Sequence, residues 1–156
     1  MTHNDVLRSL RYLLNVSDAA MVDIFRLGNR DVSRAEVVAF LKTEDDEGYQ
    51  ACGGEALAHF LNGVIVYKRG QDEGRPPQPV ELPVTNNTVL KKVRVAFELK
   101  DDDIIALLQT TGLNVSKTEL SAFFRRPDHR NYRECGDQLL RYLLKGLGSR
   151  PQTQTR

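Results

Sequence analysis

The chain has 156 residues, of which 40% are hydrophobic and 28% are charged, and its formal net charge is +1. These values exclude an intrinsically disordered chain, and the length fits one compact domain or two very small ones. No apolar run is long enough to cross a membrane and the first residues do not form a signal peptide, so we expect a cytoplasmic protein.

The first two predicted elements are helices. Residues 6–14 carry apolar side chains at the i, i+3, i+4, i+7 spacing of a helix with one buried face. A second apolar stretch, residues 21–25, follows Ser17 and Asp18, and either of these side chains is suited to cap a helix. Gly28 then suits the end of this second helix.

A third and a fourth helix follow in the same stretch of chain. Ser33 and Glu36 have the spacing of a capping box, in which each side chain satisfies a free backbone amide of the first turn. Asp45 is a plausible cap for a longer fourth helix carrying Tyr49, Cys52 and apolar residues up to position 64. The sequence therefore predicts four helices in its first half.

A linker rich in proline and glycine comes next. Residues 70–79 contain Gly70, Gly74 and three prolines, a composition that disfavours helix and suits an extended spacer.

The remainder of the chain repeats the first part at an offset of 83 residues. Residues 87–147 match residues 4–64 without a gap and 17 of the 61 aligned pairs are identical. The second copy repeats the helix signals, with acidic residues at 101–103, Gly112 at a helix end, the Ser116 and Glu119 capping box, and Asp128 as the cap of the last helix.

We therefore predict an all-α protein of two homologous four-helix repeats that pack together through their fourth helices. The expected divisions are a first helical repeat at residues 1–70, a Pro-rich linker at 71–86, a second helical repeat at 87–148 and a flexible tail at 149–156.

Several segments resemble the bacterial YehS family. They are residues 4–12 (NDVLRSLRY), 44–52 (EDDEGYQAC), 60–63 (FLNG) and 127–137 (PDHRNYRECGD). The resemblance spans both repeats and the linker. It implies a tandem repeat in a small cytoplasmic bacterial protein, and it brings no catalytic residues and no assigned function.

A Tyr-x-x-Cys-Gly motif occurs once in each copy. Its residues are Tyr49, Cys52 and Gly53 in the first copy, and Tyr132, Cys135 and Gly136 in the second. On a helix such residues share one face, and glycine lets another backbone approach, so the motif predicts a small buried cysteine at a close helix crossing. The alternative is a paired thiol site for redox or soft-metal chemistry. His59 follows Cys52, but Tyr142 replaces it in the second copy, so we expect no enzyme, no metal and no cofactor.

The near-neutral whole contains an acidic and a basic half. Residues 1–70 have 8 Lys or Arg against 10 Asp or Glu, whereas residues 87–156 have 13 against 8. The aligned segments 42–47 and 125–130 carry opposite charge, so one hypothesis is that these loops approach each other, within a chain or between chains. Solvated surface charge is the simpler interpretation.

The basic half supplies the candidate residues for a nucleic acid or another anionic partner. They are Lys91, Lys92, Arg94, Arg125, Arg126, Arg130 and Arg133. Residues 104–124 also resemble a helix-turn-helix loosely, although the connection after Gly112 is longer than that motif's turn. We expect a non-catalytic binding or adaptor module for a protein partner, which includes self-association, with nucleic-acid binding by the second repeat as the alternative.

Overall fold

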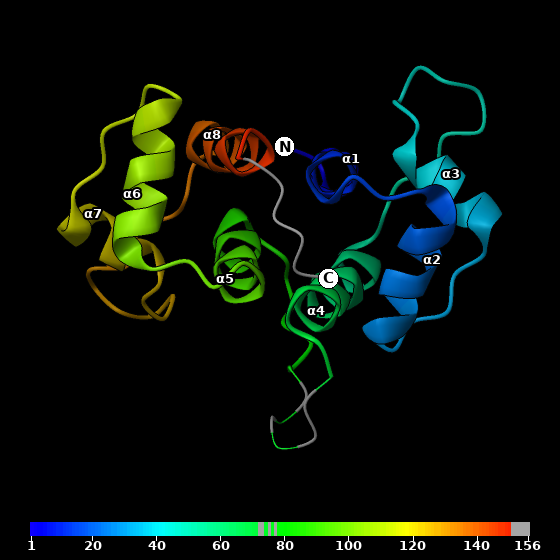
Figure 1. Cartoon of the computed structure of the whole chain (residues 1–156), viewed down its shortest axis with the longest axis horizontal. Helices are drawn as coiled ribbons and strands as arrows, with labels where there is room; N and C mark the ends of the chain where they lie inside the picture. The colour runs from blue at the N-terminus through cyan, green and yellow to red at the C-terminus, as the bar shows by residue number, and fades with distance from the viewer. Residues whose placement is uncertain (72–73, 75, 77, 151–156) are drawn as a thin grey trace. The chain divides into compact units, whose positions relative to one another are not determined.

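A computed structural model describes residues 1–71, 74, 76 and 78–150 (Figure 1). Within these residues the chain forms eight α-helices and no strand, which confirms the all-α prediction. None of these helices is both long and apolar enough to span a bilayer.

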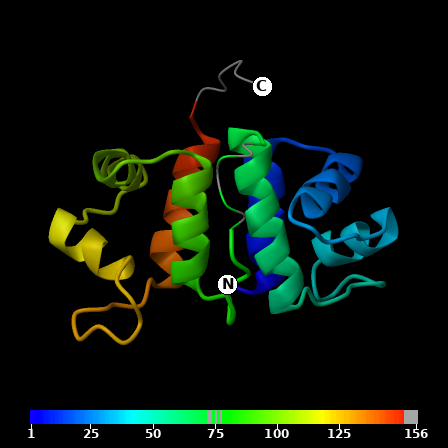
Figure 2. The same ribbon diagram turned by 90° about the horizontal axis from the view of Figure 1, so that it is seen from below.

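The chain divides into two compact units, Met1–Val84 and a second that begins at Thr85. The helices of the first are α1 (His3–Leu14), α2 (Asp18–Leu27), α3 (Arg34–Leu41) and α4 (Gly54–Arg69), and those of the second are α5 (Asn86–Ala96), α6 (Asp101–Thr110), α7 (Lys117–Phe123) and α8 (Asp137–Gly148). Figure 2 lets the reader follow both sets in chain order, from dark blue to green and from green to red. Every helix of the second unit begins 83 residues after its equivalent, so the repeat seen in the sequence is a repeat of structure.

The predicted caps hold the helix starts. Ser17 Oγ accepts a hydrogen bond from the amide of Ala20, so Ser17 and not Asp18 caps α2. Ser33 and Ser116 each form a complete capping box with the glutamate three residues later. These bonds satisfy amides that a helix leaves unpaired at its first turn.

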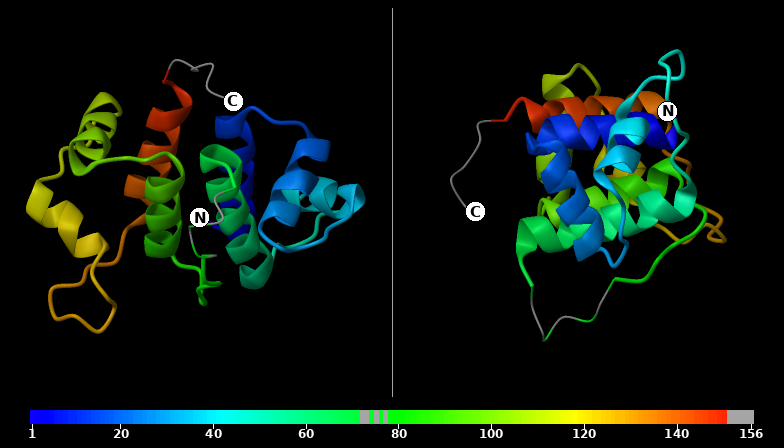
Figure 3. Two further views of the ribbon diagram at one scale, coloured as in Figure 1. Left: turned by 60° about the horizontal axis from the view of Figure 1, so that its bottom comes forward. Right: turned by 90° about the vertical axis from the view of Figure 1, so that its right-hand side faces the viewer.

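The predicted start of the fourth helix is wrong in both repeats. Asp45 and Asp128 lie in turns, and the helices begin only after Gly53 and Gly136. The turn after α3 is closed by Asp46, whose carboxylate accepts hydrogen bonds from the backbone amide and the hydroxyl of Thr43, both at 2.9 Å. The long connections between the third and fourth helices can be followed in Figure 3, where that of the second unit is orange.

The core of the first unit centres on α2 and α4. Phe25 lies with its ring centroid 4.8 Å from that of Phe60 and 6.3 Å from that of Phe40. Next to these rings the two helix backbones approach so closely that Gly28 and Gly63 have no room for a side chain. In the second unit leucines replace two of these rings, Leu108 at the position of Phe25 and Leu143 at that of Phe60. The fully buried residues of its core include Ile104, Leu108, Leu120, Leu140 and Leu143.

The end of the linker lies against the first unit. Asn62 Nδ2 donates to the carbonyls of Gln78 and Pro79, both at 3.2 Å, and His3 Nε2 donates to the Val84 carbonyl at 3.3 Å. The described linker residues before Asn86 are not helical, and Asn86, the last residue of the predicted linker, already begins α5. Residues 72–73, 75 and 77 of the predicted linker and residues 151–156 of the predicted tail lie outside the described residues. The packing of the two repeats against each other stays a prediction.

Candidate functional site

Three of the candidate basic residues line one hollow in the second unit. Arg125, Arg130 and Arg133 come from the end of α7 and the loop that follows, and the hollow has a volume of about 490 Å³. Its other lining residues are Thr118, Glu119, Ala122, Asn131 and Tyr132. We call this feature the basic hollow.

Backbone and side-chain hydrogen bonds fix the loop that carries these arginines. Arg125 Nη1 donates to the carbonyl of Asn131 at 3.3 Å, and the amide of Arg133 donates to the carbonyl of Ala122 at 3.1 Å. On its other side the carbonyl of Arg133 accepts a bond of 2.9 Å from Asn87 Nδ2 of α5. The loop is thus tied to both α7 and α5, which holds the arginines at one side of the unit.

The charges in the basic hollow are mostly positive. Among the described residues, no carboxylate lies within ion-pair distance of Arg125, Arg130 or Arg133. Glu119 is the acidic group of the lining, and hydrogen bonds from the backbone and then the side chain of Ser116 lower its pKa, so it is ionised at neutral pH. Three guanidinium groups therefore face one carboxylate, which leaves an excess of unpaired donors.

The other four candidates do not join this hollow. The prediction that Lys92 belongs to a basic surface is wrong, because its side chain is only 2% exposed. Arg94 forms an ion pair with Asp101 at 2.9 Å, and its guanidinium lies 4.6 Å from the centre of the Phe124 ring. Lys91 is exposed on α5.

Arg126 is exposed and forms an ion pair of 3.1 Å with Asp128 in its own loop. The pairing of Arg94 is also a feature of the repeat, since Arg11 and Asp18 form the equivalent ion pair at 3.2 Å in the first unit. Arg94 therefore joins α5 to α6 instead of offering a free charge to a partner.

The equivalent loop of the first unit has the same shape and the opposite charge. We call residues 43–47 the acidic turn; its carboxylates are Glu44, Asp45, Asp46 and Glu47, and all are exposed. Asp46 closes the turn through Thr43, and these hydrogen bonds lower its pKa. Lys42, the equivalent of Arg125, donates from Nζ to the carbonyl of Glu47 at 2.8 Å.

The Tyr-x-x-Cys-Gly motif precedes the fourth helix of each unit, so its predicted place within a helix is wrong. Gly53 and Gly136 have open space around them and do not lie at a helix crossing. The predicted burial of the cysteines is confirmed, since Cys52 is 5% exposed and Cys135 is 4% exposed, and both are free thiols. Burial raises the pKa of Cys52 to about 11 and that of Cys135 to about 12.

We expect both thiols to react slowly with a thiol reagent in the native protein. The thiolate is the reacting form, and a pKa raised from 9.0 to about 11 reduces its fraction roughly a hundredfold at neutral pH. Burial slows access further. Mass spectrometry of the labelled chain, with the protein in denaturant as the control, measures both rates. Equal rates in the two conditions would revive the redox hypothesis.

A buried asparagine in each unit holds the motif in place, a role that was not predicted from the sequence. Asn4 Nδ2 donates to the carbonyls of Phe40 and Gln50, both at 2.9 Å, while its Oδ1 accepts from the amide of Cys52 at 2.9 Å and from the hydroxyl of Tyr49 at 3.2 Å. In the second unit the Asn87 side chain makes the equivalent hydrogen bonds to the carbonyls of Phe123 and Arg133 and from the amide of Cys135, at 2.8 to 2.9 Å. A polar residue kept at the same place in both copies, on the apolar face of the first helix, is the signal that indicates this role.

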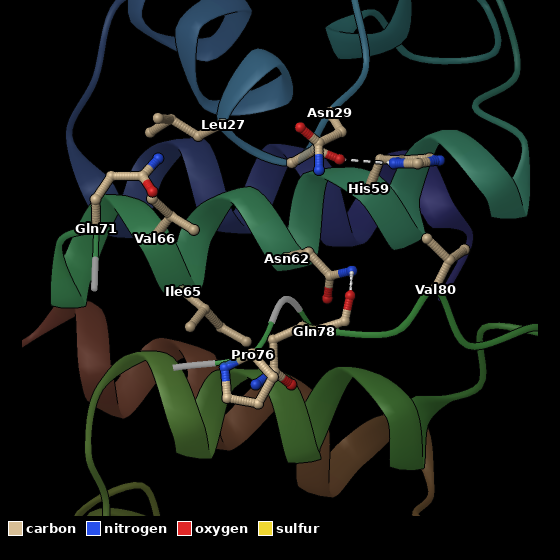
Figure 4. A pocket seen from close by; sticks show the side chains of 11 residues that line it. Leu27, Asn29, His59, Asn62, Ile65, Val66, Gln71, Pro76, Gln78 and Val80 are labelled. Carbon is tan, nitrogen blue, oxygen red and sulfur yellow. Dashed lines mark hydrogen bonds between the residues drawn. The ribbon is translucent and has the colours of Figure 1, made fainter. Parts of the chain in front are cut away.

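A second cavity, of about 210 Å³, belongs to the first unit alone (Figure 4). It lies between the end of α2, the middle of α4 and the linker, and His59 and Asn62 lie on its α4 side. His59 Nδ1 donates to the carbonyl of Gly28 at 2.7 Å, which keeps the ring against α2. Asn62 Oδ1 is buried and has no hydrogen-bond partner among the described residues. The second unit has Tyr142 and Lys145 at the equivalent positions, so this cavity is not part of the repeat.

Among the described residues, no three metal-ligating side chains come together. The arrangement that remains is one of guanidinium and phenol groups around a surface hollow. Such groups bind anions through charge and hydrogen bonds.

Comparisons with known proteins agree with the repeat. A family model described as a protein of unknown function (DUF1456) matches residues 3–70 and again residues 86–150. The chain is 48% identical over 150 residues to the uncharacterized protein YehS of Escherichia coli (strain K12), and the match covers 96% of each chain. No solved structure matches it. Because the two regions matched by the family model coincide with the two four-helix units and together span most of the sequence, this chain belongs to the DUF1456 family.

Proposed function

We propose that the protein is a non-catalytic binding module whose basic hollow takes an acidic segment of a protein partner. The observation that carries the proposal is the grouping of Arg125, Arg130 and Arg133 around one hollow with no carboxylate at ion-pair distance among the described residues. Arginine suits such a site because its planar donors match the two oxygens of a carboxylate.

The shape of the site favours a side-chain carboxylate over a nucleic-acid backbone. Phosphates along a strand require cations spread along a path. Lys92 is buried, and both Arg94 and Arg126 already have acidic partners, so the cations that remain at the hollow form a compact group. Acidic residues 101–103 at the start of α6 add negative charge to the same unit. These features support a short acidic peptide as the ligand.

The loop around the arginines also fits a binding role. The anchoring of the loop by Asn87 and by the Arg133 amide lowers the conformational entropy that binding would otherwise cost. Tyr132 lines the hollow as well, and burial is the first cause that raises the pKa of its phenol, so the hydroxyl stays protonated and able to donate. The hollow thus offers charged and neutral donors together.

We expect a short polyglutamate peptide to bind the full chain weakly and with strong dependence on salt. Exposed ion pairs contribute about 0.2–1 kcal/mol each, so three arginines give a modest affinity. The double variant Arg130→Glu, Arg133→Glu should weaken binding roughly tenfold or more, because it places like charges together. Titration followed by calorimetry or by NMR shifts of the loop amides measures this.

A matched control separates the hollow from net charge. The variant Arg141→Glu, Lys145→Glu changes the net charge equally at two exposed positions of α8 that do not line the hollow. It should bind the peptide almost as well as the unchanged protein. If both variants lost the same peptide affinity, net charge and not the basic hollow would explain the binding. Tighter binding of a short single-stranded DNA than of the peptide would favour the nucleic-acid alternative.

A further inference from the structure

The first repeat indicates which acidic segment binds in the basic hollow. We propose that the hollow binds the acidic turn of a second copy of this chain, an inference that rests on the proposed function and names its partner. The chain would then associate with itself through the third-to-fourth-helix loops of its two repeats.

Charge complementarity is the first argument. The acidic turn presents four exposed carboxylates within five residues, and the hollow presents three guanidinium groups. Glu44, Asp45 and Glu47 have no cationic partner within ion-pair distance among the described residues. Each surface thus lacks the charge that the other supplies.

The equivalence of the two loops is the second argument. Glu47 and Arg130 occupy the same position of the repeat, so one local fold carries both signs. The turn keeps its shape without using these side chains, because Asp46 closes it through Thr43 and Lys42 Nζ donates to the backbone carbonyl of Glu47. Glu44, Asp45 and Glu47 are therefore free to meet a partner without cost to the turn.

A contact of this kind is heterologous, since two different surfaces of the same chain meet. In a dimer, each copy places its acidic turn in the basic hollow of the other. In a longer assembly, each acidic turn enters the basic hollow of the next copy. Both arrangements are held by exposed ion pairs, so association is weak and is screened as the Debye length falls from about 10 Å at 0.1 M salt to about 3 Å at 1 M. Two reciprocal contacts reinforce each other because the second forms within the same complex.

The test uses sedimentation equilibrium of the full chain and two charge-reversed variants. The turn variant carries Glu44→Lys, Asp45→Lys and Glu47→Arg, and leaves Asp46 to close the turn. The hollow variant carries Arg130→Glu and Arg133→Glu. We expect the unchanged chain to associate at low salt and to become monomeric at high salt. Each variant alone should associate at least tenfold more weakly, because like charges then face each other.

Mixing the two variants gives the decisive measurement. In an equimolar mixture the reversed turn of one chain meets the reversed hollow of the other, and the two natural surfaces also meet, so association should return to nearly the level of the unchanged chain. Circular dichroism of each variant confirms that it is folded before mixing. No return on mixing, with a return of stability in a chain that carries all five substitutions, means that the loops pair within one chain and overturns the inference.

Other outcomes distinguish this inference from the proposed function. If the unchanged chain stays monomeric at low salt while polyglutamate still binds and depends on Arg130 and Arg133, the second copy is not the partner and the acidic-peptide site remains. If neither self-association nor peptide binding occurs, both proposals are wrong. Association that is unaffected by either variant places the interface elsewhere and also overturns the inference.

Discussion

Replacement of Gly63 by alanine is expected to destabilise the first repeat by about 3 kcal/mol or more. A Cβ atom on Gly63 would lie 1.9 Å from the carbonyl oxygen of Ile24, and one on Gly28 would lie 1.8 Å from the carbonyl oxygen of His59. Both obstacles are backbone atoms, so α2 and α4 would have to move apart. That movement loosens the contact between Phe25 and Phe60. Guanidinium unfolding of the full chain, followed by circular dichroism, measures the loss.

The sign of the effect makes this prediction specific. In an ordinary helix interior, alanine is more favourable than glycine by about 1 kcal/mol, so propensity alone predicts stabilisation. Gly146 is the equivalent residue of α8, and a Cβ there would lie 3.2 Å from the Leu107 carbonyl oxygen, which a small shift relieves. Gly146→Ala should therefore change stability by less than about 1 kcal/mol. A stabilised Gly63→Ala variant would contradict the close approach of the two helices.

The helices that begin with local signals were predictable from sequence. Ser17, Ser33 and Ser116 cap helices with their own side chains, and the apolar spacing of residues 6–14 gives the buried face of α1. Both kinds of signal act over three or four residues, so a single sequence contains them. The repeat at an offset of 83 residues strengthened these predictions, because each helix of the first repeat has an aligned helix in the second.

The start of the fourth helix depended on interactions that a local pattern does not contain. Gly53 and Gly136 cap α4 and α8 without any side-chain hydrogen bond, so no capping motif in the sequence marks these helix starts. Asp45 and Asp128 are better caps by residue type. They are overruled because Asn4 and Asn87 hold the backbone just before each fourth helix, through bonds that span 46 to 48 residues.

The candidate site was predictable as a charge imbalance and not as a surface. The sequence separates the charges of the two halves, but it does not distinguish Arg94, which pairs with Asp101, from Arg130, which has no ion pair among the described residues. It also gives no sign that Lys92 is buried, with an exposed fraction of only 2%. The grouping of Arg125, Arg130 and Arg133 arises from the turn between α7 and α8. The sequence had predicted a helix over residues 128–136, and so it did not predict this turn.

Asn87→Ala is expected to cost about 3 kcal/mol or more of the stability of the second repeat, and to weaken peptide binding at the hollow. The substitution leaves the carbonyls of Phe123 and Arg133 and the amide of Cys135 without their partner, and an unpaired buried group costs about 1–3 kcal/mol. Because the Arg133 carbonyl is one of these groups, the loop that carries the arginines loses its bond to α5. Denaturant unfolding and peptide titration measure the two effects.

Asn87→Asp tests whether the amide, and not only its shape, holds the loop. Aspartate keeps an oxygen for the Cys135 amide but turns the second donor position into an oxygen that faces the carbonyls of Phe123 and Arg133. Repulsion and the burial of a charge should then make this isosteric change at least as destabilising as alanine. Asn114→Ala, at an exposed position of the same unit, should stay within about 0.5 kcal/mol of the unchanged protein. If Asn87→Asp retained full stability, the two donated bonds would contribute nothing, and the loop would be held by the Arg133 amide and by Arg125 alone.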